Sequence, residues 1–125
     1  MQTNETAEVI EQFNRVFLDR DPAKLKDLIA PDCVMESIQP APDGTRYVGY
    51  DACLAFWEAL ASNTVAHFEV EETHALGDRA TIRWRFHFGD DQSLRGVNLM
   101  RVRDGRIIEA LGYSKLPGQS APLPD

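Results

Sequence analysis

The spacing of apolar residues changes once along the chain, near Asn63. Before this point apolar residues recur at helical intervals in three segments. After it they alternate with polar residues as far as Lys115. A period of three to four residues is typical of helices packed on a core, and a period of two is typical of half-buried strands. The sequence therefore predicts an α+β domain, with helices on one face of a curved, mostly antiparallel sheet.

Three helices and one strand are expected before Asn63. The first helix covers residues 6–18, with an apolar face formed by Val9, Ile10, Phe13, Val16 and Phe17. A short second helix is expected to begin at Asp21. Aspartate is a favourable N-cap residue, and Pro22 suits the first helical position. A strand at 33–38 and a loop at 40–44 follow, and Asp51 caps the third helix.

One polar residue interrupts the apolar face of the strand at 94–102. Asn98 lies on the same face as Leu94, Gly96, Met100 and Val102. A buried amide without a partner costs about 1–3 kcal/mol, so Asn98 is either a hydrogen-bonded core residue or the polar group of a pocket.

Turn lengths decide which residues lie beside Asn98. Three-residue turns at 77–79 and 90–92 keep the charges of Glu69 and Glu71 off the apolar face. They pair Phe68 with Phe88 and place Trp84 opposite Asn98, next to the space that Gly96 leaves.

Composition and charge narrow the range of partners. The net charge of −7 argues against nucleic acid, and no apolar run approaches the roughly 20 residues of a membrane span. The N-terminus lacks the pattern of a signal peptide, which favours the cytoplasm. Cys33 and Cys53 match no zinc spacing and are expected to be reduced, partly buried thiols. The three histidines are scattered, so we expect no metal and no cofactor.

Three segments resemble one known superfamily. They are DPAKLKDLIAPDCV (21–34), YVGYDA (47–52) and MRVRDGRI (100–107), and they resemble the nuclear transport factor 2-like superfamily in its SnoaL-like and ketosteroid isomerase-like branch. The resemblance covers nearly the whole chain up to Lys115. It implies a single domain at 1–115, followed by a Pro-rich tail at 116–125. It also implies a cone-shaped, cystatin-like α+β barrel with an apolar pocket, and a homodimer formed through the convex sheet face.

The catalytic groups of this superfamily are mostly replaced here. In ketosteroid isomerases the base aligns with Ser37, and the two oxyanion-hole groups align with Phe13 and Asn98. The aspartate of limonene-type epoxide hydrolases aligns with Gly112. The resemblance therefore implies a protein that is not a standard ketosteroid isomerase, although the Asn98 amide can still donate a hydrogen bond.

Asn98, Glu109 and His74 are the catalytic candidates. A two-residue turn at Asp104-Gly105 would bring Glu109 opposite Met100 into the pocket, whereas the family alignment places Ala110 and Gly112 there. His74 and Glu72 are expected at the rim of the concave face, where a His–carboxylate pair is suited to act as a general base.

The candidate ligand-binding residues are mainly aromatic. They are Phe13, Phe17, Ser37, Phe56, Trp57, Trp84, Phe86, Asn98 and Met100. Together they predict an apolar pocket for a hydrophobic small molecule, in an isomerase, cyclase or lyase. The alternative is a non-catalytic domain for ligand binding or dimerisation. An ionisable group within reach of Asn98 would discriminate between the two.

Overall fold

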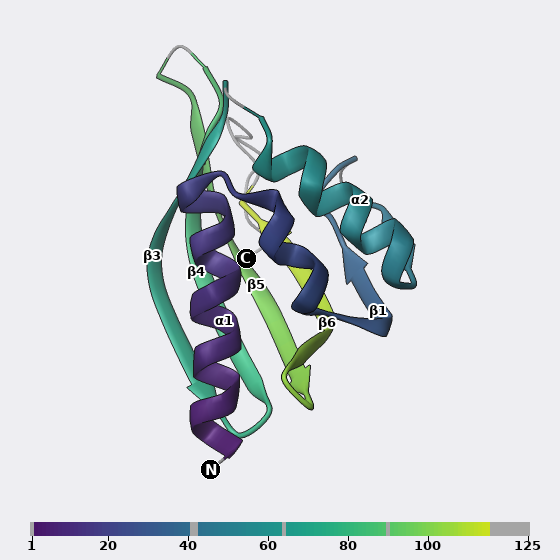
Figure 1. The fold of residues 1–125 in the computed structure, drawn as a ribbon. Coiled ribbons are helices and arrows are strands. Elements are labelled where there is room, and N and C mark those ends of the chain that lie inside the picture. The colour runs from purple at the N-terminus through teal and green to yellow at the C-terminus, as the bar shows by residue number, and fades with distance from the viewer. Residues whose placement is uncertain (1, 41–42, 64, 90, 116–125) are drawn as a thin grey trace, which may run out of the picture.

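Six strands form one curved sheet, and the helices cover its concave face (Figure 1). The computed structural model describes residues 2–40, 43–63, 65–89 and 91–115. Its elements are α1 (Gln2–Asp19), the 3-10 helix η1 (Pro22–Asp27), β1 (Ile29–Glu36), β2 (Arg46–Val48), α2 (Tyr50–Ala61), β3 (His67–Leu76), β4 (Arg79–His87), β5 (Ser93–Arg103) and β6 (Arg106–Ser114). The predicted α+β cone is confirmed. The predicted tail at 116–125 lies outside the described residues.

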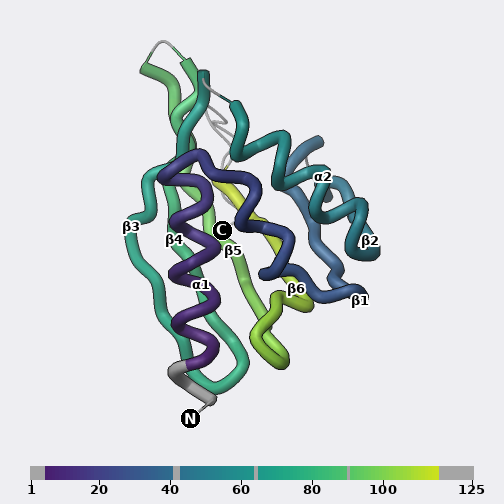
Figure 2. Tube along the Cα trace, viewed as in Figure 1, coloured from purple at the N-terminus to yellow at the C-terminus, as the bar shows by residue number. Residues whose placement is uncertain are grey.

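The order of strands in the sheet is β2-β1-β6-β5-β4-β3. All neighbours are antiparallel except β1 and β6, which run parallel. The sequence pattern did not predict β2, a three-residue edge strand that lies beside α2 (Figure 2). Helix α1 packs against β3, and α2 packs against β1.

The second helix, which the apolar positions Leu25, Leu28 and Ile29 predict to continue as far as Pro31, is shorter than expected. It is a 3-10 helix that ends at Asp27, and Asp21 makes no side-chain capping bond. Strand β1 begins at Ile29 instead of at residue 33. Ile29 is fully buried and pairs with Ile107, so its burial comes from a strand and not from a helix. Pro31 is tolerated in β1 because the pairing with β6 is irregular at this point.

The expected three-residue turn between β3 and β4 is wrong. Leu76 pairs with Arg79, so the turn has only Gly77 and Asp78 at its centre. A bulge between Val70 and Glu72 then shifts the register, and Phe68 pairs with Phe86 instead of Phe88. The bulge keeps the charged side chains of β3 off the concave face, which was the physical requirement behind the prediction.

The β4–β5 hairpin has a different register from the predicted one, but Asn98 still lies on the predicted side of the sheet. Trp84 pairs with Gly96, and Asn98 pairs with Ile82, so the predicted pairing of Trp84 with Asn98 was shifted by two positions. The connection is longer than three residues because His87 pairs with Ser93. A shift of two positions preserves the face, so Trp84 and Asn98 still share the concave side.

The β5–β6 hairpin reconciles the two alternatives for Glu109. Arg103 pairs with Arg106, so the two-residue turn at Asp104-Gly105 is confirmed. A register shift follows between Arg101 and Val102, and it pairs Ala110 with Met100. Ala110 therefore lies on the concave side, while Glu109 lies opposite Arg101 on the convex side.

Three further features concern the described part of the chain. Cys33 and Cys53 are free, as predicted, and they are fully buried instead of partly buried. No described helix is long and apolar enough to cross a membrane. Likewise, the described residues contain no group of three or more His, Cys, Asp or Glu side chains that could hold a metal ion.

Candidate ligand-binding cavity

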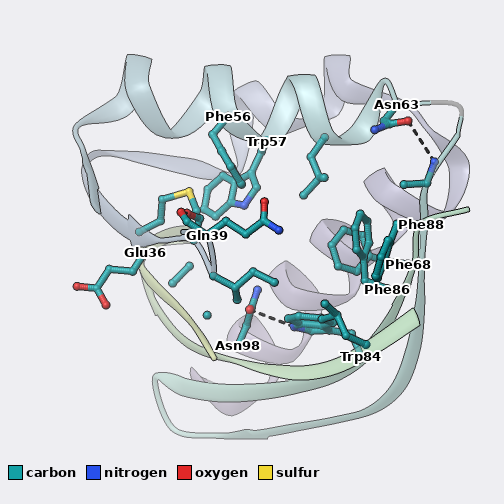
Figure 3. Close-up of a pocket in the computed structure, with 18 of the residues that line it drawn as sticks. Glu36, Gln39, Phe56, Trp57, Asn63, Phe68, Trp84, Phe86, Phe88 and Asn98 are labelled. Carbon is teal, nitrogen blue, oxygen red and sulfur yellow. Dashed lines mark hydrogen bonds between the residues drawn. The ribbon is translucent and has the colours of Figure 1, made fainter. Parts of the chain in front are cut away.

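A cavity of about 820 Å³ lies between α2 and the concave face of the sheet (Figure 3). This volume is in the range that accommodates a small organic ligand. Most of its lining is aromatic or aliphatic, and it comes from α2, all six strands and the segments that follow β1, α2 and β4. The lining residues are Met35, Glu36, Ser37, Ile38, Gln39, Pro40, Tyr47, Phe56, Trp57, Leu60, Asn63, Val65, Ala66, Phe68, Trp84, Phe86, Phe88, Leu94, Asn98, Ala110 and Gly112.

An aromatic wall forms one side of the cavity. The Phe68 ring meets Trp84 edge-on at a centroid distance of 5.4 Å and lies 4.6 Å from Phe86. Phe86 in turn lies parallel to Phe88 at 5.9 Å. These spacings are those of favourable aromatic pairs, so the rings support one another and leave an apolar surface facing the cavity.

Asn98 places a polar group in these apolar surroundings. The indole Nε1 of Trp84 donates a hydrogen bond to Asn98 Oδ1 over 3.1 Å. An indole N–H can only donate, so the amide oxygen must face Trp84 and the amide nitrogen must face the other way. Figure 3 shows this nitrogen directed into the cavity. Asn98 therefore fulfils both alternatives: half of its amide is satisfied in the protein, and half is offered to the cavity.

Two glycines make this arrangement sterically feasible. A Cβ atom at Gly96 would lie 2.3 Å from Trp84 Cη2, so the indole can lie over β5 only because no side chain is present. A Cβ atom at Gly112 would lie 3.3 Å from Asn98 Oδ1. The expectation that Gly96 leaves space beside Trp84 and Asn98 is confirmed.

The loop after β1 brings a second amide to the cavity. Ser37 Oγ and Thr45 Oγ1 both donate to the backbone oxygen of Gln39, over 3.0 and 2.8 Å. The Gln39 side chain reaches into the cavity (Figure 3). Gln39 was missed in the sequence, although it continues the alternation of Met35 and Ser37 beyond the end of β1.

Most of the predicted ligand-binding residues come together. Ser37, Phe56, Trp57, Trp84, Phe86 and Asn98 line the cavity. Phe13 and Phe17 line a smaller neighbouring cavity of about 50 Å³, behind Trp57 and Phe68. Met100 is buried and belongs to the core, outside both linings.

Two of the three catalytic candidates lie outside the cavity. His74 is on the convex side, where its Nε2 lies 3.1 Å from Glu72, and 71% of its side chain is exposed. The expectation that His74 and Glu72 reach the concave face is wrong, because the bulge after Val70 reverses the faces of the following residues. Glu109 is also on the convex side for the corresponding reason in β6.

Charged groups are turned away from the cavity. Glu36 is the carboxylate among the described lining residues, and its Oε2 lies 2.8 Å from Arg46 Nη1, outside the cavity (Figure 3). No histidine is found in the described lining. Lowered carboxylate pKa values occur on the convex face, where Arg83 lowers the pKa of Glu72 and His87 lowers the pKa of Glu69, mainly by hydrogen bonding.

Comparison with known families places the chain among its relatives. The family model of the SnoaL-like domain matches residues 10–110. The chain belongs to the SnoaL-like family. A comparison with curated proteins finds no match to this SnoaL-like protein.

Solved structures confirm the NTF2-like fold. An NTF2-like protein of unknown function from Mesorhizobium loti is 53% identical, with 92% of this chain and 94% of that chain covered and a TM-score of 0.88. A steroid delta-isomerase from Pseudomonas aeruginosa is 21% identical, with 90% and 81% covered and a TM-score of 0.74. An LEH-like epoxide hydrolase from M. tuberculosis is 18% identical, with 92% and 86% covered and a TM-score of 0.74. At these last two identities only the fold is shared.

Proposed function

We propose that this SnoaL-like protein binds an apolar small molecule that carries an oxygen atom, and that Asn98 donates a hydrogen bond to this oxygen. The supporting observation is the bond from Trp84 Nε1 to Asn98 Oδ1, which leaves the amide nitrogen directed into the cavity. The site therefore selects ligands with an acceptor, such as a carbonyl or hydroxyl oxygen, in an otherwise apolar skeleton.

The geometry favours binding and orientation over proton transfer. General acid–base catalysis needs an ionisable group within hydrogen-bond reach of the reacting atom. Among the described lining residues, the carboxylate of Glu36 is engaged with Arg46 and turned outward. Folds shared with an isomerase and an epoxide hydrolase support an apolar ligand, but this cavity offers a hydrogen-bond donor without an adjacent carboxylate or imidazole among its described residues.

A matched pair of probes tests the proposal. Bicyclohexyl and 4-cyclohexylcyclohexanone share a skeleton and differ by one ketone oxygen. Their binding can be followed through the fluorescence of Trp57 and Trp84, the two tryptophans of the chain, which both line the cavity. One hydrogen bond contributes about 1 kcal/mol, so the ketone should bind about fivefold more tightly than the hydrocarbon.

The variant Asn98→Leu should remove this preference and keep the affinity for the hydrocarbon. Asn14→Leu is the matched control, because Asn14 contacts the small neighbouring cavity and bonds to Thr73. Equal binding of both probes to the unmodified protein would contradict the proposal, and so would a ketone preference that survives in a folded Asn98→Leu variant.

We also propose that two copies pair through the convex sheet face. Leu99 and Tyr113 are 41% and 53% exposed on this face, and they pair across β5 and β6 with Leu111 and Val97. These four side chains form an apolar patch between charged neighbours, which is the pattern of a two-fold interface.

A further inference from the structure

We infer that Ile38 is a specificity-determining residue of the cavity, and that it restricts the ligand to molecules whose acceptor oxygen is flanked by unbranched carbons. This inference rests on the proposed binding function and defines its ligand class more narrowly. Ile38 follows the end of β1, lines the cavity and packs against the hydrophobic core. It is partly buried, so its side chain is held by the protein and still borders the cavity.

Gly112 allows Ile38 to lie close to the Asn98 amide. Gly112 is the residue of β6 that pairs with Asn98. A Cβ atom at Gly112 would lie 3.3 Å from Asn98 Oδ1 and 3.4 Å from Ile38 Cγ2, so these two atoms border one small gap. Non-bonded carbon atoms normally lie about 3.5–4.0 Å apart, so the gap is too narrow for a ligand carbon. Ile38 therefore forms a wall beside the amide.

Trp84 forms the wall on the opposite side of the amide. In the sheet, β6 and β1 lie on one side of β5, and β4 lies on the other. Ile38 comes from the β1 side, whereas Trp84 comes from β4 and donates its indole hydrogen bond to Asn98 Oδ1. A ligand oxygen that accepts a hydrogen bond from the Asn98 nitrogen thus has Ile38 on one flank and Trp84 on the other.

Neither wall yields easily to a bulky ligand. Ile38 is branched at Cβ, which restricts rotation of its side chain. Trp84 is buried and meets the Phe68 ring edge-on at 5.4 Å. A methylene group next to the oxygen-bearing carbon needs little width, whereas a branched carbon at that position overpacks the site. The ligand class is therefore a ketone or a secondary alcohol with methylene groups on both sides of the oxygen-bearing carbon.

A hindered ketone tests the role of Ile38. In 4-cyclohexyl-2,2-dimethylcyclohexanone a pair of methyl groups is added next to the ketone of 4-cyclohexylcyclohexanone. This pair must face Ile38 or, if the ring is turned over, Trp84. The dimethyl ketone should therefore bind the unmodified protein about tenfold more weakly than the parent ketone, as measured by tryptophan fluorescence. Ile38→Ala opens one flank and should bring the two affinities close together.

Three further variants locate the effect. Ile38→Val keeps the branch at Cβ and should retain the discrimination between the two ketones. Ile38→Met keeps a similar volume in an unbranched, flexible chain, so it should weaken the discrimination even if Ile38→Ala does not fold. Ile108→Ala is the matched control, because Ile108 is a partly buried isoleucine outside the described lining of the cavity. Circular dichroism verifies that each variant is folded.

The outcomes separate the role of Ile38 from the proposed function. If 4-cyclohexylcyclohexanone binds more tightly than bicyclohexyl but the dimethyl ketone binds as tightly as its parent, the role of Ile38 is refuted and the proposed function stands. A discrimination that persists unchanged in the folded Ile38→Ala or Ile38→Met protein also refutes this role. If 4-cyclohexylcyclohexanone shows no advantage over bicyclohexyl, the proposed function fails, and the inference built on it fails as well.

Discussion

Replacing Gly96 with alanine should disturb the structure and the recognition group together. The added Cβ atom would lie 2.3 and 2.4 Å from two ring carbons of Trp84 and 2.4 Å from the backbone oxygen of Tyr113. Non-bonded carbon atoms normally lie about 3.5–4.0 Å apart, so the indole or β6 must move by more than about 1 Å. Trp84 is only 5% exposed and packs edge-on against Phe68, so a movement of the indole disturbs this contact as well.

The expected change in the free energy of unfolding of Gly96→Ala is the sum of three contributions. Overpacking of a filled core costs about 1–3 kcal/mol, and losing the bond from Trp84 to Asn98 costs about 1 kcal/mol more. Alanine is better than glycine inside a strand by about 0.5–1 kcal/mol, which offsets part of this cost. The free energy of unfolding should therefore fall by about 1–3 kcal/mol. For a chain of this length, 1 kcal/mol corresponds to about 4 °C, so Tm should fall by about 4–12 °C.

Thermal unfolding and probe binding measure the two effects. Gly96→Ala should lower Tm by the amount above, and it should also reduce the ketone preference because the Asn98 amide is no longer held by Trp84. Gly112→Ala is the control for Tm alone, since its nearest contact would be the Glu36 oxygen at 3.1 Å, which needs only a small adjustment. It is not a control for binding, because the new Cβ atom would lie 3.3 Å from Asn98 Oδ1 in the cavity. A Gly96→Ala protein with unchanged Tm and unchanged ketone preference would refute the role assigned to Trp84.

Two further predictions concern the convex face and the buried thiols. Leu99→Glu should convert the proposed dimer into a monomer, as measured by analytical ultracentrifugation. Leu18→Glu, a change at a comparably exposed leucine of α1, should leave the dimer intact. If the unmodified protein is itself a monomer, the proposed pairing is contradicted. Burial raises the pKa of the Cys33 and Cys53 thiols, so the folded state binds more protons than the unfolded state above the usual thiol pKa of about 8.5. The free energy of unfolding should therefore fall as the pH rises above about 8.5. Denaturant titrations of Cys33→Ala should show a smaller fall over the same pH range. An identical pH dependence in both proteins would contradict the role of the Cys33 thiol in this loss of stability.

The fold class could be predicted because it depends on local periodicity. Helical spacing in α1 and α2 and alternation in β3 to β6 follow from which residues are buried. The parallel pairing of β1 with β6 could not be predicted in this way. It joins Ile29 to Ile107, and nothing in the spacing of either segment specifies its partner.

The sequence predicted the site correctly where the prediction needed only the sheet face of a side chain and not the pairing register of its strand. Trp84 and Asn98 were expected on one face and are joined by a hydrogen bond, although their register was shifted by two positions. His74 was assigned to the cavity side by counting in two-residue steps across a bulge, and the same counting from the Asp104-Gly105 turn gave the alternative that placed Glu109 there. One inserted residue reverses every following side chain, and no residue type in these strands signals where the insertion occurs.

Asn98 is better explained by recognition than by packing alone. If its only function were to satisfy the Trp84 indole, an apolar pair of similar shape would fill the same volume at little cost, because replacing both partners of a buried hydrogen bond is nearly neutral. The observed pair leaves one half of the amide facing an 820 Å³ cavity. A half-used amide in apolar surroundings is fully satisfied when an acceptor is bound. The bond to Trp84 fixes which half remains open, so the proposed ligand must offer this amide an acceptor and not a donor.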